Sequence, residues 1–416
     1  METKRGLKFL KLAPRSHAKS SCTSVVFPSW LIGKNPNIRL LICSNTQSQA
    51  NLFVGENKAN IEGNDKYIEI FGNLKPDDPS KWTQSEFTVK RTRILKDATL
   101  LGLGVGSAII ARRADGIIID DAVDQENSAT ELQRKKLKTW FWKTLFPVLE
   151  PHGFVIFIGT RWHYDDLYND LLENPDFDRE VLKAVINEEK KEVLWSERWS
   201  YDKLMEIKRN AGSIIFNCQY QNDPSGMKGR IFNVDWFKYY EVIDWKSLKL
   251  FMAIDPAISE ALDADYFALC VIGIDSEGKV YILDMFRGHL TLHAQVEKIF
   301  EYWLKYDGKI TKVGIETVAY QKALKQEIDR ISAKTNQYVP TKELQADKDK
   351  VRRAIQLSSV FENGLIFFRK DWTYLYDELL QFPDAKHDDM VDALGYAIQL
   401  SREAGKYEVL PALENW

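Results

Sequence analysis

The chain has 416 residues, of which 44% are hydrophobic and 28% are charged, and its formal net charge is −3. These proportions are typical of a globular protein of roughly two or three domains, and they exclude a polycation, so any nucleic-acid contact must come from a local basic face. The four cysteines form no Cys-x-x-Cys pair, which argues against a disulfide framework or a zinc site. No apolar run approaches the roughly 20 residues of a membrane span, and the mixed first residues do not resemble a signal peptide. We therefore expect a soluble intracellular protein.

The first half of the chain is expected to alternate between strands and helices. Short apolar runs at 7–12, 38–43, 116–119 and 154–158 are typical of buried parallel strands, and 131–145 has the pattern of a helix. This alternation predicts an α/β domain with a mostly parallel sheet, which we place at 1–212.

The stretch "APRSHAKS", residues 13–20, follows the first predicted strand and ends in the Lys-Ser pair of the phosphate-binding motif G-x-x-x-x-G-K-[ST]. Backbone N–H groups at the start of a helix would bind phosphate, Lys19 would reach the β- and γ-phosphates, and Ser20 would hold Mg²⁺. The expected nucleotide-binding residues are Arg15, Ser16, His17, Ala18, Lys19, Ser20, Ser21 and Asp120. Alanine replaces both glycines of the motif, which predicts right-handed or extended backbone at Ala13 and Ala18. The alternative is a solvated Lys-Ser pair in a basic loop.

Two further strand ends carry side chains that suit nucleotide hydrolysis. The run 116–119 ends in Asp120, a candidate Mg²⁺ ligand acting through water, and Asp121, a candidate base for the attacking water. The run 154–158 leads to Thr160, which could sense the γ-phosphate. Aspartates that cap a helix after a strand are the alternative, but three such parts in this order favour a P-loop ATPase.

Phosphoryl transfer also needs cations beyond Mg²⁺. Arg15, inside the loop, could act within the same chain, and Arg112 or Arg113 could act as a finger toward a neighbouring subunit. Surface salt bridges or DNA-phosphate contacts are the alternatives for each arginine.

A cluster of turn-forming residues at 222–229 predicts the domain boundary, and we expect a connector at 213–247 whose aromatic residues are core rather than base-stacking surfaces. A second α/β pattern follows, with strands at 250–254, 268–274 and 280–286, a hairpin turn at 276–278, a strand at 312–315 and helices near 292–303, 321–331, 348–362, 372–381 and 388–402. The second domain is placed at 248–403, and a loose tail at 404–416.

In the second predicted domain, acidic residues stand at the ends of strands and at the start of the last helix. Asp255 and Glu316 each end a predicted strand, and Asp388, Asp389 and Asp392 open the last helix, where spacings of three and four residues put them on one face. Such acids can hold two Mg²⁺ or Mn²⁺ ions for phosphodiester hydrolysis, and the element order predicts a ribonuclease H-like fold. The alternative is that acids simply favour helix N-termini. The loop acids Asp263 and Asp265 are weaker candidates.

The stretches "APRSHAKSS", "GIIIDDAVD", "IFIGTRWH", "FNCQYQNDP", "AIDPA", "GIET" and "KHDDMVDAL", in this order, resemble the large terminase subunit of tailed bacteriophages. The resemblance covers nearly the whole chain. It implies an ATP-driven motor that moves double-stranded DNA into a procapsid, and a nuclease that cuts concatemeric DNA. It further implies a portal protein and a small terminase subunit as partners, a ring of about five subunits, and residence in the host cytoplasm but not in the mature virion.

The resemblance also assigns roles by motif. It implies phosphate and Mg²⁺ binding by Lys19 and Ser20, the Mg²⁺ aspartate at Asp120, and Asp121 in place of the family's usual catalytic glutamate. Thr160 matches the motif that couples ATP hydrolysis to movement. Asp255, Glu316, Asp388 and Asp389 match the nuclease's metal ligands. The family's loop often lacks the standard glycines. The strand before this loop begins close to Met1, which leaves adenine recognition unexplained.

Two other functions remain open at this stage. A helicase–nuclease of DNA repair shares the chemistry, although the sequence shows no second motor domain. A packaging adaptor without hydrolysis is suggested by the two alanines. The basic cluster Lys348, Lys350, Arg352 and Arg353, with Lys322 and Lys325, could line a DNA groove, but a solvated helix face is the simpler interpretation.

Overall fold

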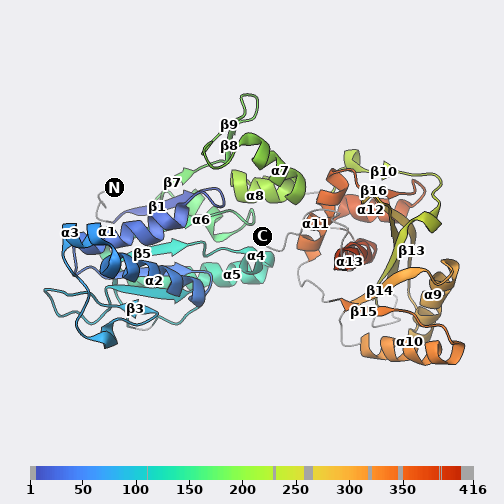
Figure 1. The fold of residues 1–416 in the computed structure, drawn as a ribbon, viewed down its shortest axis with the longest axis horizontal. Helices are drawn as coiled ribbons and strands as arrows, with labels where there is room; N and C mark the ends of the chain where they lie inside the picture. Colours follow the sequence, from blue (N-terminus) through green and yellow to red (C-terminus); the bar gives the residue numbers. More distant parts are fainter. Residues whose placement is uncertain are drawn as a thin grey trace. The chain divides into compact units, whose positions relative to one another are not determined.

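The computed structural model describes residues 6–109, 111–227, 231–256, 266–316, 321–344, 350–383, 385 and 387–403. The chain divides into two compact units (Figure 1): the first consists of Met1–Met205 and Phe216–Ser225, and the second of Glu206–Ile215 and Gly226–Trp416. The predicted tail 404–416, the acids Asp263 and Asp265, and Lys348 lie outside the described residues. Within the described ranges, no helix combines the length and apolar character that a membrane crossing requires.

The first unit is built on a sheet whose seven strands run in the order β3-β4-β2-β5-β6-β1-β7 among the described residues. All neighbours in it are parallel except β3 and β4, as the alternation of strands and helices predicted. A separate two-stranded sheet pairs β8 with β9. The strands are β1 (Lys8–Leu12), β2 (Leu40–Ser44), β3 (Glu86–Phe87), β4 (Leu100–Gly104), β5 (Ala114–Asp120), β6 (Leu149–Gly159), β7 (Asp178–Val181), β8 (Val185–Asn187) and β9 (Glu192–Val193).

Helices follow most of these strands. They are α1 (Phe27–Lys34), α2 (Gln47–Gly63), α3 (Asp65–Phe71), α4 (Gln125–Ala129), α5 (Glu131–Trp140) and α6 (Leu167–Glu173), with π-helical turns at Ser21–Val26 and Phe141–Leu145 and 3₁₀ turns at Pro79–Lys81 and Phe146–Val148. The helix predicted at 131–145 is therefore an α-helix that continues as a π turn. The chain passes between the units within α7 (Tyr201–Ala211), within α8 (Ser213–Gln221) and again after Ser225.

Parallel strands bring their carboxyl ends to one edge of the sheet. Because β1, β5 and β6 are neighbours, the residues that follow them lie side by side at this edge. The register pairs Leu12 of β1 with Gly159 of β6, and Asp120 of β5 with Ile158 of β6. The sheet therefore positions the loop after Leu12, the pair Asp120-Asp121 and Thr160 next to one another.

The second unit contains a mixed sheet in the order β10-β16-β13-β12-β11-β14-β15 among the described residues. Strands β11, β12 and β13 form an antiparallel meander, β14 runs parallel to β11, and β15 runs parallel to β14. The strands are β10 (Lys238–Tyr239), β11 (Lys249–Asp255), β12 (Phe267–Ile274), β13 (Val280–Gly288), β14 (Ile310–Glu316), β15 (Thr341–Leu344) and β16 (Ile366–Phe368).

Helix α13 is one of the helices that pack on this sheet. In Figure 1, α13 (dark red) lies beside the strands of the second unit, and it contacts β11, β12 and β14. The helices are α9 (Leu292–Lys305), α10 (Gln321–Thr335), α11 (Lys350–Glu362), α12 (Thr373–Gln381) and α13 (Asp389–Glu403), with 3₁₀ turns at Ser225–Met227, Val234–Trp236 and Trp245–Ser247. Phe232 and Phe237 are buried in the core of this unit, as predicted, whereas Tyr239 is exposed.

Candidate active sites

The loop after β1 is held by the neighbouring strand and by α8. The Ala13 N–H donates to the Gly159 carbonyl oxygen at 3.0 Å. Arg15 donates twice to Gln219, from its backbone N–H to the carbonyl oxygen at 3.0 Å and from Nη1 to the side-chain oxygen at 3.1 Å. Gln219 is buried, and no sequence pattern indicated that it would anchor this loop. Its placement requires the packing of α8 against a loop two hundred residues earlier.

The backbone of the loop corrects one prediction. Ala18 has φ 56° and Ser16 has φ 59°, both in the left-handed region that costs an L-residue about 1–2 kcal/mol. Ala13 is not among the residues of positive φ, so the prediction is confirmed at position 13 and wrong at position 18. Ala18 has the position of the second motif glycine, directly before Lys19. The loop therefore adopts at Ala18 the left-handed backbone that is typical of the motif glycine, and the alanine is strained in that conformation.

Lys19, Asp121 and Thr160 meet at the edge of the sheet. The Lys19 Nζ atom lies 2.6 Å from Thr160 Oγ1 and 2.9 Å from Asp121 Oδ2, and the lysine side chain is only 7% exposed. Asp121, the first residue after β5, has φ 44°, a left-handed conformation that is strained for a residue other than glycine. The structure thus brings together three residues that the sequence predicted from three separate strand ends.

Asp120 is held by hydroxyl groups from the helix that follows the loop. Ser20 Oγ donates to Asp120 Oδ1 at 2.9 Å, and Ser24 Oγ donates to Asp120 Oδ2 at 2.5 Å. Burial, and next the negative charge of Asp121, raises the pKa of Asp120 to about 6. Ser24 was not among the predicted site residues. Its spacing of four residues from Ser20 places both hydroxyls on one helix face, and this signal was available.

The other predicted loop residues surround this centre without joining it. The His17 ring lies 6.0 Å from the Trp199 ring in a stacked arrangement, its Nδ1 atom is 2.8 Å from the Arg15 carbonyl oxygen, and burial lowers its pKa. Ser16 and Ser21 are exposed. The Trp199 indole N–H donates to the Ser16 carbonyl oxygen at 3.3 Å.

The candidate arginine finger has partners within its own chain. Arg112 forms ion pairs with Glu86 at 3.2 Å and with Asp97 at 3.9 Å, and its side chain is about one third exposed. Arg113 donates from Nη1 to the Arg112 carbonyl oxygen. A trans role for either residue stays a prediction.

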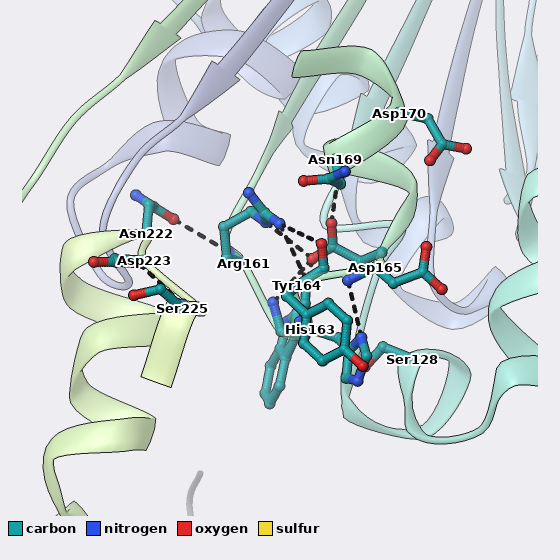
Figure 2. A network of polar contacts seen from close by, with 12 residues as sticks. Ser128, Arg161, His163, Tyr164, Asp165, Asn169, Asp170, Asn222, Asp223 and Ser225 are labelled. Carbon is teal, nitrogen blue, oxygen red and sulfur yellow. Dashed lines mark hydrogen bonds and ion pairs between the residues drawn. The ribbon is translucent and has the colours of Figure 1, made fainter. Parts of the chain in front are cut away.

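Arg161, directly after Thr160, is the centre of a polar network (Figure 2). Its guanidinium pairs with the buried Asp166 at 3.1 Å and donates to the carbonyl oxygens of His163 and Tyr164, while its backbone N–H donates to Asn222 at 3.2 Å. Asn222 follows α8 and also donates to the Leu182 carbonyl oxygen. The network fixes the chain that carries Thr160 to the end of α8.

In the second unit, Asp255 and Glu316 are the last residues of two adjacent parallel strands. The register pairs Ile254 with Ile315, so the two carboxyl groups follow as neighbours and hydrogen-bond each other. Burial, and next the Glu316 carboxylate, raises the pKa of Asp255 well above its usual range. Tyr396 of α13 donates its hydroxyl to Glu316 at 2.5 Å.

The acids of α13 divide into two groups. Asp392 pairs with Arg353 of α11 at 2.6 Å, and Lys350 lies 2.9 Å from Asp388 and 3.4 Å from Asp392. Asp389 is buried, and its negative charge contributes to the raised pKa of Asp255. The solvated-face interpretation is therefore wrong for Arg353, whose side chain is only 9% exposed.

Within the described part of the chain, no three His, Cys, Asp or Glu side chains converge closely enough to hold a metal ion. The structure brings Asp255 and Glu316 together but pairs Asp388 and Asp392 with cations. The oxygen atoms present nevertheless fit a divalent cation at the strand ends of the sheet in each unit. Ser20 and Asp120 offer adjacent hard oxygen atoms, and the buried pair Asp255–Glu316 needs a proton or a cation to offset its charge.

Comparison with known proteins agrees with this geometry. Residues 252–400 match the family described as the terminase RNaseH-like domain. The large terminase subunit of enterobacteria phage T3 is 28% identical over 191 residues, which are 45% of this chain and 31% of that protein. The chain thus spans under a third of that relative's length.

The whole fold also matches a solved protein. The large terminase of a thermophilic bacteriophage aligns with 95% of this chain and 94% of its own length, with a TM-score of 0.55 at 11% identity in one crystal form. Another crystal form of the same terminase gives a TM-score of 0.51 at 10% identity. The α/β and ribonuclease H-like folds predicted from the sequence are confirmed. The chain has the fold of a large terminase subunit, and residues 252–400 of its second unit match the terminase RNaseH-like domain family.

Proposed function

We propose that the chain is a DNA-packaging motor with its own nuclease. In this proposal the first unit hydrolyses ATP to move double-stranded DNA into a procapsid, and the second unit cuts the DNA when packaging begins and ends. The observation that carries the proposal is the convergence of Lys19, Thr160 and Asp121 beside the Ser20–Asp120 pair, in one chain with a terminase nuclease fold.

The contacts suggest how the first unit acts on ATP. Lys19 neutralises Asp121 at 2.9 Å, and a triphosphate would compete for the same ammonium group. Movement of Lys19 to the phosphates would leave the Asp121 carboxylate able to accept a proton from the attacking water. Thr160 contacts both groups, so it is placed to respond to that exchange. Mg²⁺ held by Ser20 and Asp120 would neutralise phosphate charge.

Arg161 provides a route from this chemistry to the rest of the unit. Its backbone N–H donates to the side-chain oxygen of Asn222, which follows α8, its guanidinium pairs with Asp166, and it follows Thr160 directly. We infer that a shift of Thr160 would be transmitted along this network, as a packaging motor requires. The additional cation could come from Arg15, or from Arg112 or Arg113 of a neighbouring subunit.

In the second unit, Asp255, Glu316 and Asp389 are the best candidates to hold divalent cations, with Asp388 and Asp392 as further candidates. Such ions, Mg²⁺ or Mn²⁺, would supply Lewis-acid stabilisation of the phosphodiester during cleavage. Tyr396 orients Glu316 through its hydroxyl group, and Arg353 orients Asp392. The buried Arg353 of α11 therefore positions an acid rather than facing solvent, whereas Lys350 contacts acids and stays about half exposed.

The partners follow from the proposed function. They are double-stranded DNA, a portal protein and a small terminase subunit, with a ring of about five copies assembled on the procapsid. The compartment would be the cytoplasm of the infected host cell.

The test is incubation of supercoiled plasmid with the protein and Mn²⁺ or Mg²⁺, together with a steady-state ATPase assay. We expect nicked and linear plasmid, and ATP hydrolysis that depends on Lys19. Protein that hydrolyses no ATP and cuts no plasmid under either metal would contradict the proposal. Translocation along blunt duplex without unwinding would separate a packaging motor from a helicase.

A further inference from the structure

The second unit contains a pocket of about 460 Å³ that the proposed nuclease chemistry does not use. Its wall combines aromatic rings, thioethers and one arginine. The side chains that matter here are Tyr266, Phe286, Arg287, Trp372, Tyr374 and Met390. The volume falls in the range of small-molecule sites, and the lining is mostly apolar with a few fixed polar groups.

The pocket adjoins the proposed cleavage site. The sheet register pairs Asp255 with Ala268, only two residues beyond Tyr266. Met390 lines the pocket and follows Asp389 directly. The Tyr266 ring also lies 4.8 Å from the ring of His387, which precedes Asp388. A strand whose phosphodiester lies at Asp255 and Asp389 would therefore have a neighbouring nucleotide within reach of the pocket.

The charged side chains of the pocket wall already have partners: Arg287 pairs with Glu378, and Asp371 pairs with Arg369. The Arg287 guanidinium lies 5.0 Å from the centroid of the Tyr266 ring and 4.9 Å from that of the Tyr374 ring. The same guanidinium forms an ion pair with the buried Glu378, which also accepts the Met390 N–H at 3.1 Å. Glu378 thus ties the wall of the pocket to the first turn of α13.

This arrangement favours a neutral, planar ligand over a phosphate group. The positive charge of Arg287 is offset by Glu378, and its guanidinium lies close to the rings of Tyr266 and Tyr374. The Tyr374 side chain is 67% exposed, so part of its ring stays open to a ligand. Nucleobases stack on such rings with little dependence on sequence.

We propose that this pocket receives one unstacked nucleobase of the DNA strand that is cut at the neighbouring carboxylates. The inference rests on the proposed nuclease function. It adds a substrate class: DNA that is single-stranded or locally opened at the cut, because a paired base cannot enter a pocket without leaving its stack.

The test compares three oligonucleotide substrates in Mn²⁺: a fully paired duplex, the same duplex with a central mismatch bubble, and the single strand. The full-length protein should cut the bubble and the single strand faster than the duplex. Tyr374→Ala should slow cutting of the bubble substrate roughly ten-fold, so that the bubble is cut little faster than the duplex. Tyr374→Phe should keep the faster cutting of the bubble. The matched control is Tyr338→Ala, because Tyr338 is 69% exposed in the same unit and lies outside the pocket.

A second readout does not need cleavage. The bubble substrate carries 2-aminopurine, and EDTA is present to prevent cleavage. The fluorescence of 2-aminopurine should change when wild type or Tyr338→Ala binds the substrate, and should change much less when Tyr374→Ala binds it. If wild type cuts no substrate, the proposed nuclease function fails, whatever the fluorescence shows. If wild type cuts but Tyr374→Ala matches Tyr338→Ala in cutting and in fluorescence, the pocket holds no base and this inference is overturned.

Discussion

Replacing Ala18 with glycine is expected to stabilise the first unit, although glycine is usually the more destabilising residue. Ala18 has φ 56°, where an L-residue is strained by about 1–2 kcal/mol and glycine is not. Glycine also makes the unfolded chain more flexible, which offsets about 0.4–1 kcal/mol of this gain. The net expectation is a gain of roughly 0.5–1 kcal/mol, which corresponds to a rise in Tm of about 1–4 °C for a unit of this size.

The matched control is Ala13→Gly, at the other glycine position of the same motif. Ala13 is buried, its φ is not positive, and its N–H donates to the Gly159 carbonyl oxygen at 3.0 Å. There glycine relieves no strain, so the free energy of unfolding should fall by roughly 0.5–1 kcal/mol. Differential scanning calorimetry of both variants would measure the two shifts. A Tm that falls equally in both variants would refute the assignment of strain to Ala18.

Three further outcomes are expected. Lys19→Ala should lower the ATPase rate at least about 100-fold, measured by phosphate release, while Mn²⁺-dependent plasmid cleavage stays within about two-fold of wild type. Asp255→Ala should remove Mn²⁺-dependent plasmid cleavage and leave the ATPase rate near that of wild type. Plasmid cleavage that survives this change would exclude Asp255 from the nuclease site. Asp120→Asn should raise the free energy of unfolding at pH 8 without Mg²⁺ or nucleotide, by up to the order of 2–3 kcal/mol, because the folded-state pKa is raised from 3.8 to about 6. The sign follows from proton binding. The folded protein binds the Asp120 proton more tightly than the unfolded chain does, so the wild type loses stability as pH rises from about 4 to about 6. An equal Tm of variant and wild type at pH 8 would contradict the burial of a charged Asp120.

What the sequence could predict depended on sheet geometry. Asp120 and Thr160 end neighbouring strands of the first unit, and Asp255 and Glu316 end neighbouring strands of the second. An apolar run reveals where a strand ends, and parallel neighbours bring their ends to one edge. Residues at strand ends were therefore found without knowledge of any side-chain contact.

The contacts that were missed depend on packing between distant elements. Gln219 reaches the loop at Arg15 only because α8 lies beside that loop, and Arg353 reaches Asp392 only because α11 packs on α13. No local pattern encodes these distances. The left-handed backbone of Ala18 was missed for a different reason, since intrinsic preference disfavours it and the contacts of the surrounding loop override that preference.

The pairing of cations with acids narrows the choice of metal ligands in the second unit. Asp388 and Asp392 share Lys350, and Asp392 also holds Arg353, so a metal ion at either acid must displace or repel a positive group already in contact. Asp255 and Glu316 instead face each other, and burial, followed by the neighbouring Glu316 carboxylate, raises the pKa of Asp255. A divalent cation gains most where negative charge is least compensated. We therefore expect Asp388→Asn to weaken Mn²⁺-dependent cleavage far less than Asp255→Asn or Glu316→Gln.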